Sequence, residues 1–288
     1  MINLVVAGLV SGSIYALMAV GLIVVYRASR VMNFAHGTFV GFAAFLALSL
    51  HTSSHLPLWA AGGIAIVATV ALALLTEGVF VYPLRHASRL ELLAVTAGVS
   101  LVLSGGMLQL FGTQDRLFPR FAPGTAFRLA NSAIPLQNVT TILATLAVLG
   151  IIAALFYLTR IGVAMRAASE NAQLSMLVGI SPKAVSLTSW GVAGAMAAAA
   201  AILVAPDVPL TADTFSNLMI QSFAALVLGG FTSLLGAVVG GYLLGVGLNL
   251  FSFFVKSDIP STFILCVVLG VLMIRPEGLF GRKESLRL

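Results

Sequence analysis

Long apolar runs separated by short polar segments dominate this sequence. A membrane-spanning helix needs about 20 apolar residues, and most of the runs reach or approach that length. The run over residues 217–254 is too long for one crossing at about 1.5 Å per residue, and its GGFTSLLG stretch can break a helix. We therefore predict an all-α, polytopic transmembrane bundle, with eight spans if a segment near 229–236 is re-entrant and nine if the helix breaks there and crosses twice. The apolar runs cover residues 2–26, 34–50, 58–81, 92–112, 138–158, 184–205, 217–254 and 262–274.

The composition leaves no room for a large soluble domain. Hydrophobic residues make up 60% of the 288 residues and charged residues only 8%, whereas a soluble domain usually carries about 25% charged residues. Residues 1–288 are therefore expected to form a single transmembrane domain. The net charge of +6 is dispersed along the chain rather than clustered, which argues against nucleic acid as a partner. One cysteine, Cys266, excludes an intrachain disulfide.

The basic residues predict how the chain is oriented. If the N-terminus lies outside and the chain crosses nine times, eleven of the fifteen Lys and Arg residues fall inside, as the positive-inside rule requires. The first basic residue is Arg27, after the first apolar run, so we expect that run to be a retained span rather than a signal peptide. The inner group is Arg27, Arg30, Arg85, Arg89, Arg160, Arg166, Lys183, Arg275, Arg282, Lys283 and Arg287, and the outer group is Arg116, Arg120, Arg128 and Lys256.

Five ordered blocks of the sequence resemble a known family. They are SGSIYALMAVGLIVVYRASRVMNFAHG from residue 11, YPLRHASRLELLAVTAGVSLVL from residue 82, SENAQLSMLVGI from residue 169, LGGFTSLLGAVVGG from residue 228 and RPEGLFGR from residue 275. The chain resembles the permeases of ATP-driven importers for branched-chain amino acids, and in particular the shorter of their two permease subunits. The resemblance extends over almost the whole chain.

The resemblance implies a function and a set of partners. The chain is expected to form a translocation path for branched-chain amino acids or a related small amphipathic solute in a bacterial or archaeal cytoplasmic (inner) membrane. The implied partners are a second permease subunit, two cytoplasmic ATPase subunits and an extracytoplasmic solute-binding protein, with lipid around the bundle. No cofactor is expected in this chain. A P-loop requires a Gly-Lys pair that the sequence lacks, so partner subunits would use the ATP and the chain itself is expected not to be an enzyme.

Candidate path residues are polar or glycine positions within the apolar runs. Asn33, His36 and Gly37 belong to the NFAHG motif, and we expect Asn33 and His36 either to face the solute or to stabilise a helix start. Thr96 and Ser100 are four residues apart and share one helix face. Their hydroxyls can face the solute or bond to carbonyls of their own helix. Gly229 and Gly230 mark the predicted helix break.

A second candidate region is the inner segment 159–183. It is expected to form one short surface helix ended by Gly179 and Pro182, and it reads either as a simple connector or as a docking element for a partner. The resemblance places contact with the ATPase at residues 164–179. Arg166, Glu170, Asn171 and Gly179 are the expected coupling residues.

Two other polar features have simpler explanations. Glu77 is an acid within an apolar run, and we expect it to reach the interface or to pair with Arg85 or Arg89. His51 and His55 have the spacing of two metal ligands, but no third ligand is nearby in the sequence, so no metal site is expected.

Rival functions remain open from the sequence alone. A stand-alone channel or ion-coupled carrier is the first alternative, although such a carrier usually needs more ionisable residues at membrane depth. An ABC permease for urea or short amides is another. An intramembrane enzyme is the least supported, because no pair of nucleophile and base is visible.

Overall fold

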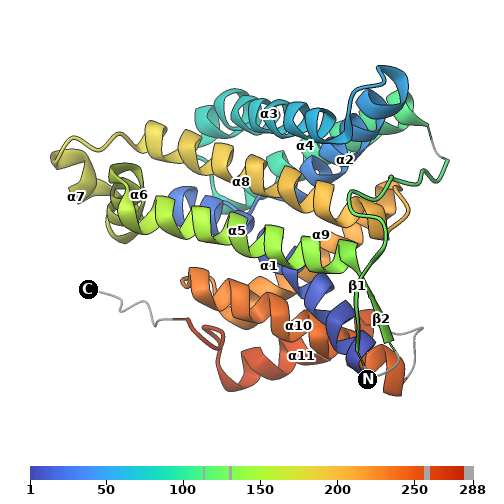
Figure 1. Cartoon of the computed structure of the whole chain (residues 1–288). Coiled ribbons are helices and arrows are strands. Elements are labelled where there is room, and N and C mark those ends of the chain that lie inside the picture. The colour runs from blue at the N-terminus through green and yellow to red at the C-terminus, as the bar shows by residue number, and fades with distance from the viewer. Residues whose placement is uncertain (113, 130–131, 256–259, 282–288) are drawn as a thin grey trace.

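The helices of this chain run back and forth between two ends of one bundle (Figure 1). The computed structural model describes residues 1–112, 114–129, 132–255 and 260–281. Within that part, the only strands form a two-stranded antiparallel sheet, β1 (Thr125–Leu129) and β2 (Ser132–Pro135). The prediction of an all-α polytopic bundle is confirmed, and the small sheet lies in the long outer loop, where the apolar pattern gave no sign of it.

Nine helices of 15 residues or more occur in the described ranges. Six of these segments are long and apolar enough to cross a membrane by length and composition. The other three, α2, α9 and α11, are shorter or less apolar. The nine are α1 (Ile2–Ser29), α2 (His36–Ser53), α3 (Leu58–Leu75), α4 (Arg89–Phe111), α5 (Leu136–Leu158), α8 (Pro182–Val204), α9 (Ala212–Gly229), α10 (Leu234–Phe254) and α11 (Pro260–Ile274).

Short elements connect these helices. Between α3 and α4 the chain forms a π-helical turn (Thr76–Val81) and a 3₁₀ turn (Tyr82–Leu84). Two short helices, α6 (Arg160–Glu170) and α7 (Ala172–Leu177), lie between α5 and α8. A further 3₁₀ turn (Ala205–Asp207) follows α8.

The two ends of the bundle match the predicted sides of the membrane. We call the end that holds α6 and α7 the inner end, and the end that holds β1 and β2 the outer end (Figure 1). Arg27 and Arg30 lie at the inner end, where both bond to Ser169 of α6. At the outer end, Leu210 donates its backbone N–H to the carbonyl of Arg116. Among the charged residues assigned to a side, Lys256, Arg282, Lys283 and Arg287 lie outside the described residues.

The long apolar run breaks where its glycines predict. α9 ends at Gly229, Gly230 adopts a left-handed φ of 101°, and α10 starts at Leu234 with Ser233 as its cap. The turn packs at the inner end against the segment after α11, because Phe280 donates its N–H to the carbonyl of Gly229 at 3.1 Å. α9 and α10 therefore run in opposite directions, and this run crosses the bundle twice.

Close packing of α1 against α10 forms the centre of the bundle. A Cβ added at Gly245 of α10 would lie 2.3 Å from the backbone nitrogen of Gly12, and one at Gly8 would lie 2.7 Å from the Cα of Val246. Small residues allow helix backbones to approach this closely in lipid, where the hydrophobic effect does not drive association. The glycines spaced by four residues in α1 and α10 thus serve helix packing.

The expected pairing of Glu77 is wrong. Glu77 is only 1% exposed and lies in the π-helical turn, where the hydroxyl of Ser186 on α8 donates to its Oε1. Arg85 instead places its guanidinium over the ring of Tyr82, 4.6 Å from the centroid. The π-helical turn directs the carboxyl group into the bundle rather than toward the interface, a difference that the sequence pattern does not reveal.

The packing of α1 on α10 generates a stability prediction. Gly245→Ala should lower the free energy of unfolding by about 1–3 kcal/mol, because the added methyl group meets backbone atoms that cannot move aside. Gly98→Ala in α4 is the matched control, since a Cβ there meets nothing within 4 Å. Thermal melting of the detergent-solubilised variants measures the difference, and equal melting temperatures for both would contradict the packing argument.

Candidate functional site

A short non-helical segment, residues 31–35, enters the bundle between α1 and α2. α1 ends at Ser29, Arg30 takes the left-handed conformation at φ 57°, and α2 begins only at His36. Thr96 contacts this segment: its hydroxyl accepts from the N–H of Phe34 at 3.3 Å, and its proton lies within reach of two carbonyls, that of Met32 at 3.2 Å and that of Leu93 in its own helix at 3.0 Å. Thr96 follows the start of α4 by seven residues, so the segment lies about 10 Å deep along that helix.

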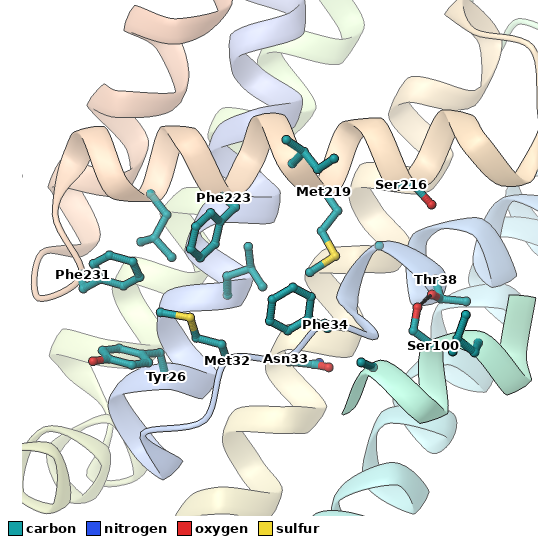
Figure 2. Close-up of a pocket in the computed structure, with 16 residues that line it drawn as sticks. Tyr26, Met32, Asn33, Phe34, Thr38, Ser100, Ser216, Met219, Phe223 and Phe231 are labelled. Carbon is teal, nitrogen blue, oxygen red and sulfur yellow. Dashed lines mark hydrogen bonds between the residues drawn. The ribbon is translucent and has the colours of Figure 1, made fainter. Parts of the chain in front are cut away.

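A cavity of about 490 Å³ lies beside this segment, and we call it the inner cavity. Its walls come from the segment itself and from α1, α2, α4 and α9 (Figure 2). Most of the lining is apolar, and the polar contributions come from Tyr26, Asn33, Thr38, Ser100 and Ser216. A mostly apolar pocket with a few fixed polar groups is the usual form of a small-molecule site.

The polar groups of the inner cavity are held in place by hydrogen bonds. Thr38 of α2 and Ser100 of α4 share a hydrogen bond of 2.6 Å across the two helices (Figure 2). Asn33 is 1% exposed, and its Oδ1 accepts from the N–H of Ala35 at 3.0 Å. In the part of the chain that the structure describes, its Nδ2 has no partner. The amide of Asn33 thus places an unpaired donor beside the cavity, although its Nδ2 is itself buried.

The structure brings some predicted path residues together and separates others. Asn33, Gly37 and Ser100 line the inner cavity. Thr96 lies behind the cavity wall, where its hydroxyl bonds both to residues 31–35 and to the carbonyl of Leu93 in its own helix. Gly229 ends α9 and Gly230 starts the turn to α10, immediately before Phe231, which lines the cavity. The roles of these residues in transport remain predictions.

His36 is placed behind the cavity. It is fully buried, and a Cβ added at Gly21 of α1 would lie 2.7 Å from its Cε1. Neither ring nitrogen has a hydrogen-bond partner among the described residues. Gly21 thus provides the space for the imidazole, a role that sequence reasoning missed because nothing in the sequence pairs the two positions.

The inner segment 159–183 forms two helices, so the expectation of a single helix is wrong. Asn171 is extended, at φ −153° and ψ 101°, and its Oδ1 accepts from the N–H of Leu174 to cap α7. Gly179 ends α7 with φ 83°, and the N–H of Ile180 bonds to the carbonyl of Ser175. That pattern of bonds is a Schellman motif, in which glycine adopts the left-handed position.

The surface of α6 and α7 is open at the inner end. Glu170, Asn171 and Gly179 are exposed, whereas Arg166 is partly buried and bonds to the carbonyl of Phe156. Leu177 is 82% exposed and Val178 is 76% exposed, so apolar side chains stand beside the exposed polar groups. An exposed apolar patch rimmed by polar residues is typical of a protein-binding surface.

Two arginines connect this surface to the inner cavity. Arg27 donates to the hydroxyl of Ser169, and Arg30 donates to its carbonyl oxygen, both at 3.2 Å. Arg30 directly precedes residues 31–35, of which Met32, Asn33 and Phe34 line the cavity. The end of α6 and the cavity wall are therefore joined through one short stretch of chain. Ser169 carries no sequence signal that would have identified it.

The fold and the site together define a multi-pass membrane protein of the transport class. A bundle of spans encloses a cavity beside a broken helix, and an exposed segment lies at one end. The family model described as "Branched-chain amino acid transport system / permease component" matches residues 4–275. The chain belongs to this family and is a permease of the inner membrane.

Similar proteins cover nearly the whole chain. The high-affinity branched-chain amino acid transport system permease protein LivH of Salmonella typhimurium is 31% identical over 294 residues, which cover 96% of this chain and 94% of the relative. BraD of Pseudomonas aeruginosa, a permease protein of the same description, is 30% identical and covers 97% and 95%. The probable LivH of Methanocaldococcus jannaschii is 27% identical and covers 95% and 90%.

One solved structure is distantly similar. PsaBC from Streptococcus pneumoniae in complex with Fab is 11% identical, with a TM-score of 0.47, over 93% of this chain and 89% of that chain. A likeness at this level carries no argument about the site.

The anchoring role of Thr96 generates a second prediction. Thr96→Val should lower the free energy of unfolding by about 1 kcal/mol or more, because the N–H of Phe34 loses its acceptor and the carbonyls of Met32 and Leu93 lose a donor. Thr145→Val is the matched control, since Thr145 is equally buried and its hydroxyl has no partner among the described residues. Denaturant unfolding in detergent compares the two. A Thr96→Val variant as stable as Thr145→Val would remove Thr96 as the anchor.

Proposed function

We propose that this chain forms part of the translocation path of an ATP-driven importer for branched-chain amino acids or a closely related small amphipathic solute. The inner cavity is the observation that carries the proposal. Its walls are apolar, as an aliphatic side chain requires, and Asn33, Thr38 and Ser100 supply hydrogen-bonding groups on one side. The printed descriptions of the similar permeases support the choice of solute class.

The energy for uphill transport is proposed to come from separate ATPase subunits. The sequence lacks the Gly-Lys pair of a P-loop. We further propose a second permease subunit beside this one and an extracytoplasmic binding protein that delivers the solute at the outer end. No nucleic acid or cofactor bound to this chain is part of the proposal.

The ATPase contact is proposed to lie on α6 and α7. Their exposed surface combines Glu170, Asn171 and Gly179 with the apolar Leu177 and Val178. Closure of the ATPase dimer would move α6, and the bonds from Arg27 and Arg30 to Ser169 would carry that movement to residues 31–35. The nucleotide would thus bias two arrangements of the cavity wall, which is a population shift between two states.

A substitution in the inner cavity tests its part in the path. Ser100→Leu removes a polar group and fills part of the cavity, so we expect the maximal uptake rate of leucine to fall by about tenfold or more, a change worth about 1.4 kcal/mol. Ser104→Leu is the matched control, because Ser104 lies one turn further along α4 and does not line the cavity. Uptake into proteoliposomes containing the assembled transporter measures both variants.

Two outcomes would contradict the proposal. An equal effect of both serine substitutions would show that the cavity plays no special part in uptake. Solute flux through proteoliposomes that contain this chain alone, without partners or ATP, would support the channel or ion-coupled carrier instead. Uptake competition among leucine, short amides and urea separates the solute classes.

The coupling surface generates another prediction. Glu170→Gln should lower leucine uptake and solute-stimulated ATP hydrolysis by several fold, because a charge at the proposed docking surface contributes to holding the ATPase. Glu91→Gln is the matched control: Glu91 is an acid at the same end of the bundle, and glutamine can keep its capping interaction with Ser88. Undiminished transport in Glu170→Gln would show that Glu170 has no coupling role. Gly179→Ala separately tests the backbone geometry at the end of α7, where Gly179 has a φ of 83°.

A further inference from the structure

A second cavity, of about 400 Å³, lies toward the outer end, and we call it the outer cavity. It is bounded by α1, α9 and the 3₁₀ turn that follows α8. α9 presents Asn217 and Gln221 to the outer cavity, and Met219 and Phe223 to the inner cavity. Positions two residues apart lie on nearly opposite sides of a helix, so α9 separates the two cavities.

Some polar side chains of the outer cavity have partners and others do not. Ser11 accepts from Asn249, and the hydroxyl of Thr214 donates to the carbonyl of Pro209. In the described part of the chain, the side chains of Tyr15, Asn217 and Gln221 make no hydrogen bond to another residue. Other polar residues of the same helices bond within their own helix: Ser13 donates to the carbonyl of Leu9 at 2.8 Å, and Ser222 donates to that of Leu218 at 2.7 Å. Asn217 is exposed and Gln221 is partly buried, whereas Tyr15 is only 5% exposed. A buried hydroxyl such as that of Tyr15 is costly to leave unpaired unless a polar occupant of the cavity bonds to it.

The outer cavity also has a carboxylate at its rim. Asp207 lines the cavity and interacts electrostatically with Arg120 from the outer loop. A carboxylate accepts strong, charge-assisted hydrogen bonds from an ammonium group. The amides of Asn217 and Gln221 and the hydroxyl of Tyr15 can donate to a carboxylate. Ile14, Val204 and Leu218 add an apolar part to the same lining.

We propose that the outer cavity binds the charged head group of an α-amino acid before the solute passes to the inner cavity. Asp207 accepts from the ammonium group, and Tyr15, Asn217 and Gln221 donate to the carboxylate. This inference rests on the proposed function, because it assigns the zwitterionic part of the proposed solute to one place in the chain. The inner cavity, with mostly apolar walls, then receives the aliphatic side chain.

Uptake by the complete assembly, with saturating binding protein, tests the role of the two polar groups. Asp207→Asn and Gln221→Leu should each lower the maximal leucine uptake rate by about tenfold, while ATP hydrolysis without solute stays unchanged. Asp207→Glu should recover part of the rate. Asp115→Asn is the matched control, because Asp115 is an exposed acid of the outer loop that does not line the cavity.

A labelling experiment supplies a readout that does not depend on transport. In a Cys266→Ser background, Gln221→Cys should react with a membrane-impermeant thiol reagent added from outside. Leucine should slow that reaction at least threefold, whereas 4-methylpentanoate, which has the same carbon skeleton but no ammonium group, should not. Phe223→Cys, on the opposite side of α9, should remain unlabelled from outside.

The outcomes separate this inference from the proposed function. If the wild-type assembly fails to take up leucine, the proposed function is wrong. If uptake is normal in both Asp207→Asn and Gln221→Leu, only the head-group site is wrong. If leucine and 4-methylpentanoate protect Gln221→Cys equally, or if neither protects it, the outer cavity does not recognise the ammonium group. Either result would overturn the inference.

Discussion

The obligation to satisfy every backbone polar group in the absence of water is the constraint on which this structure depends. Residues 31–35 leave the helical pattern at membrane depth, where N–H and C=O groups would otherwise be unpaired. Thr96 meets part of that need by bonding to both Phe34 and Met32, and the side chain of Asn33 bonds to Ala35. The neighbouring helices can therefore leave an open space beside the segment. The inner cavity exists because a break in the helix is stabilised by side chains from the protein itself.

Much of the architecture can be predicted from the sequence because it depends on the length of the apolar runs. Apolar length predicts the spans, and the glycines after α9 mark a turn because Gly230 takes a left-handed conformation. The direction in which a side chain points, and the group to which it bonds, are harder to predict. Glu77 enters the bundle because a π-helical turn changes the direction of its side chain, and Asn171 divides an apparently continuous helix because its side chain caps the second half. Each of these depends on local backbone geometry that residue spacing does not encode.

Only part of the candidate site could be predicted from the sequence, because contacts between different helices are not encoded by residue spacing. Asn33 and Ser100 are polar residues in apolar runs, and this is enough to draw attention to them. The sequence could not show that His36 lies against Gly21 rather than in the lining of the inner cavity, since this contact forms only when α1 and α2 pack together. Ser169 could not be identified from the sequence for the same reason. Its contacts come from Arg27 and Arg30, which reach it from the end of α1.

The position of α9 as a shared wall has a geometric consequence. The inner cavity borders one face of this helix and the outer cavity borders the opposite face. A sideways shift of α9 toward one cavity would therefore narrow that cavity and widen the other, if the remaining walls stay in place. The two cavities share α9 as a wall, so their volumes depend on each other. The position of this one helix thus sets the volumes of both cavities.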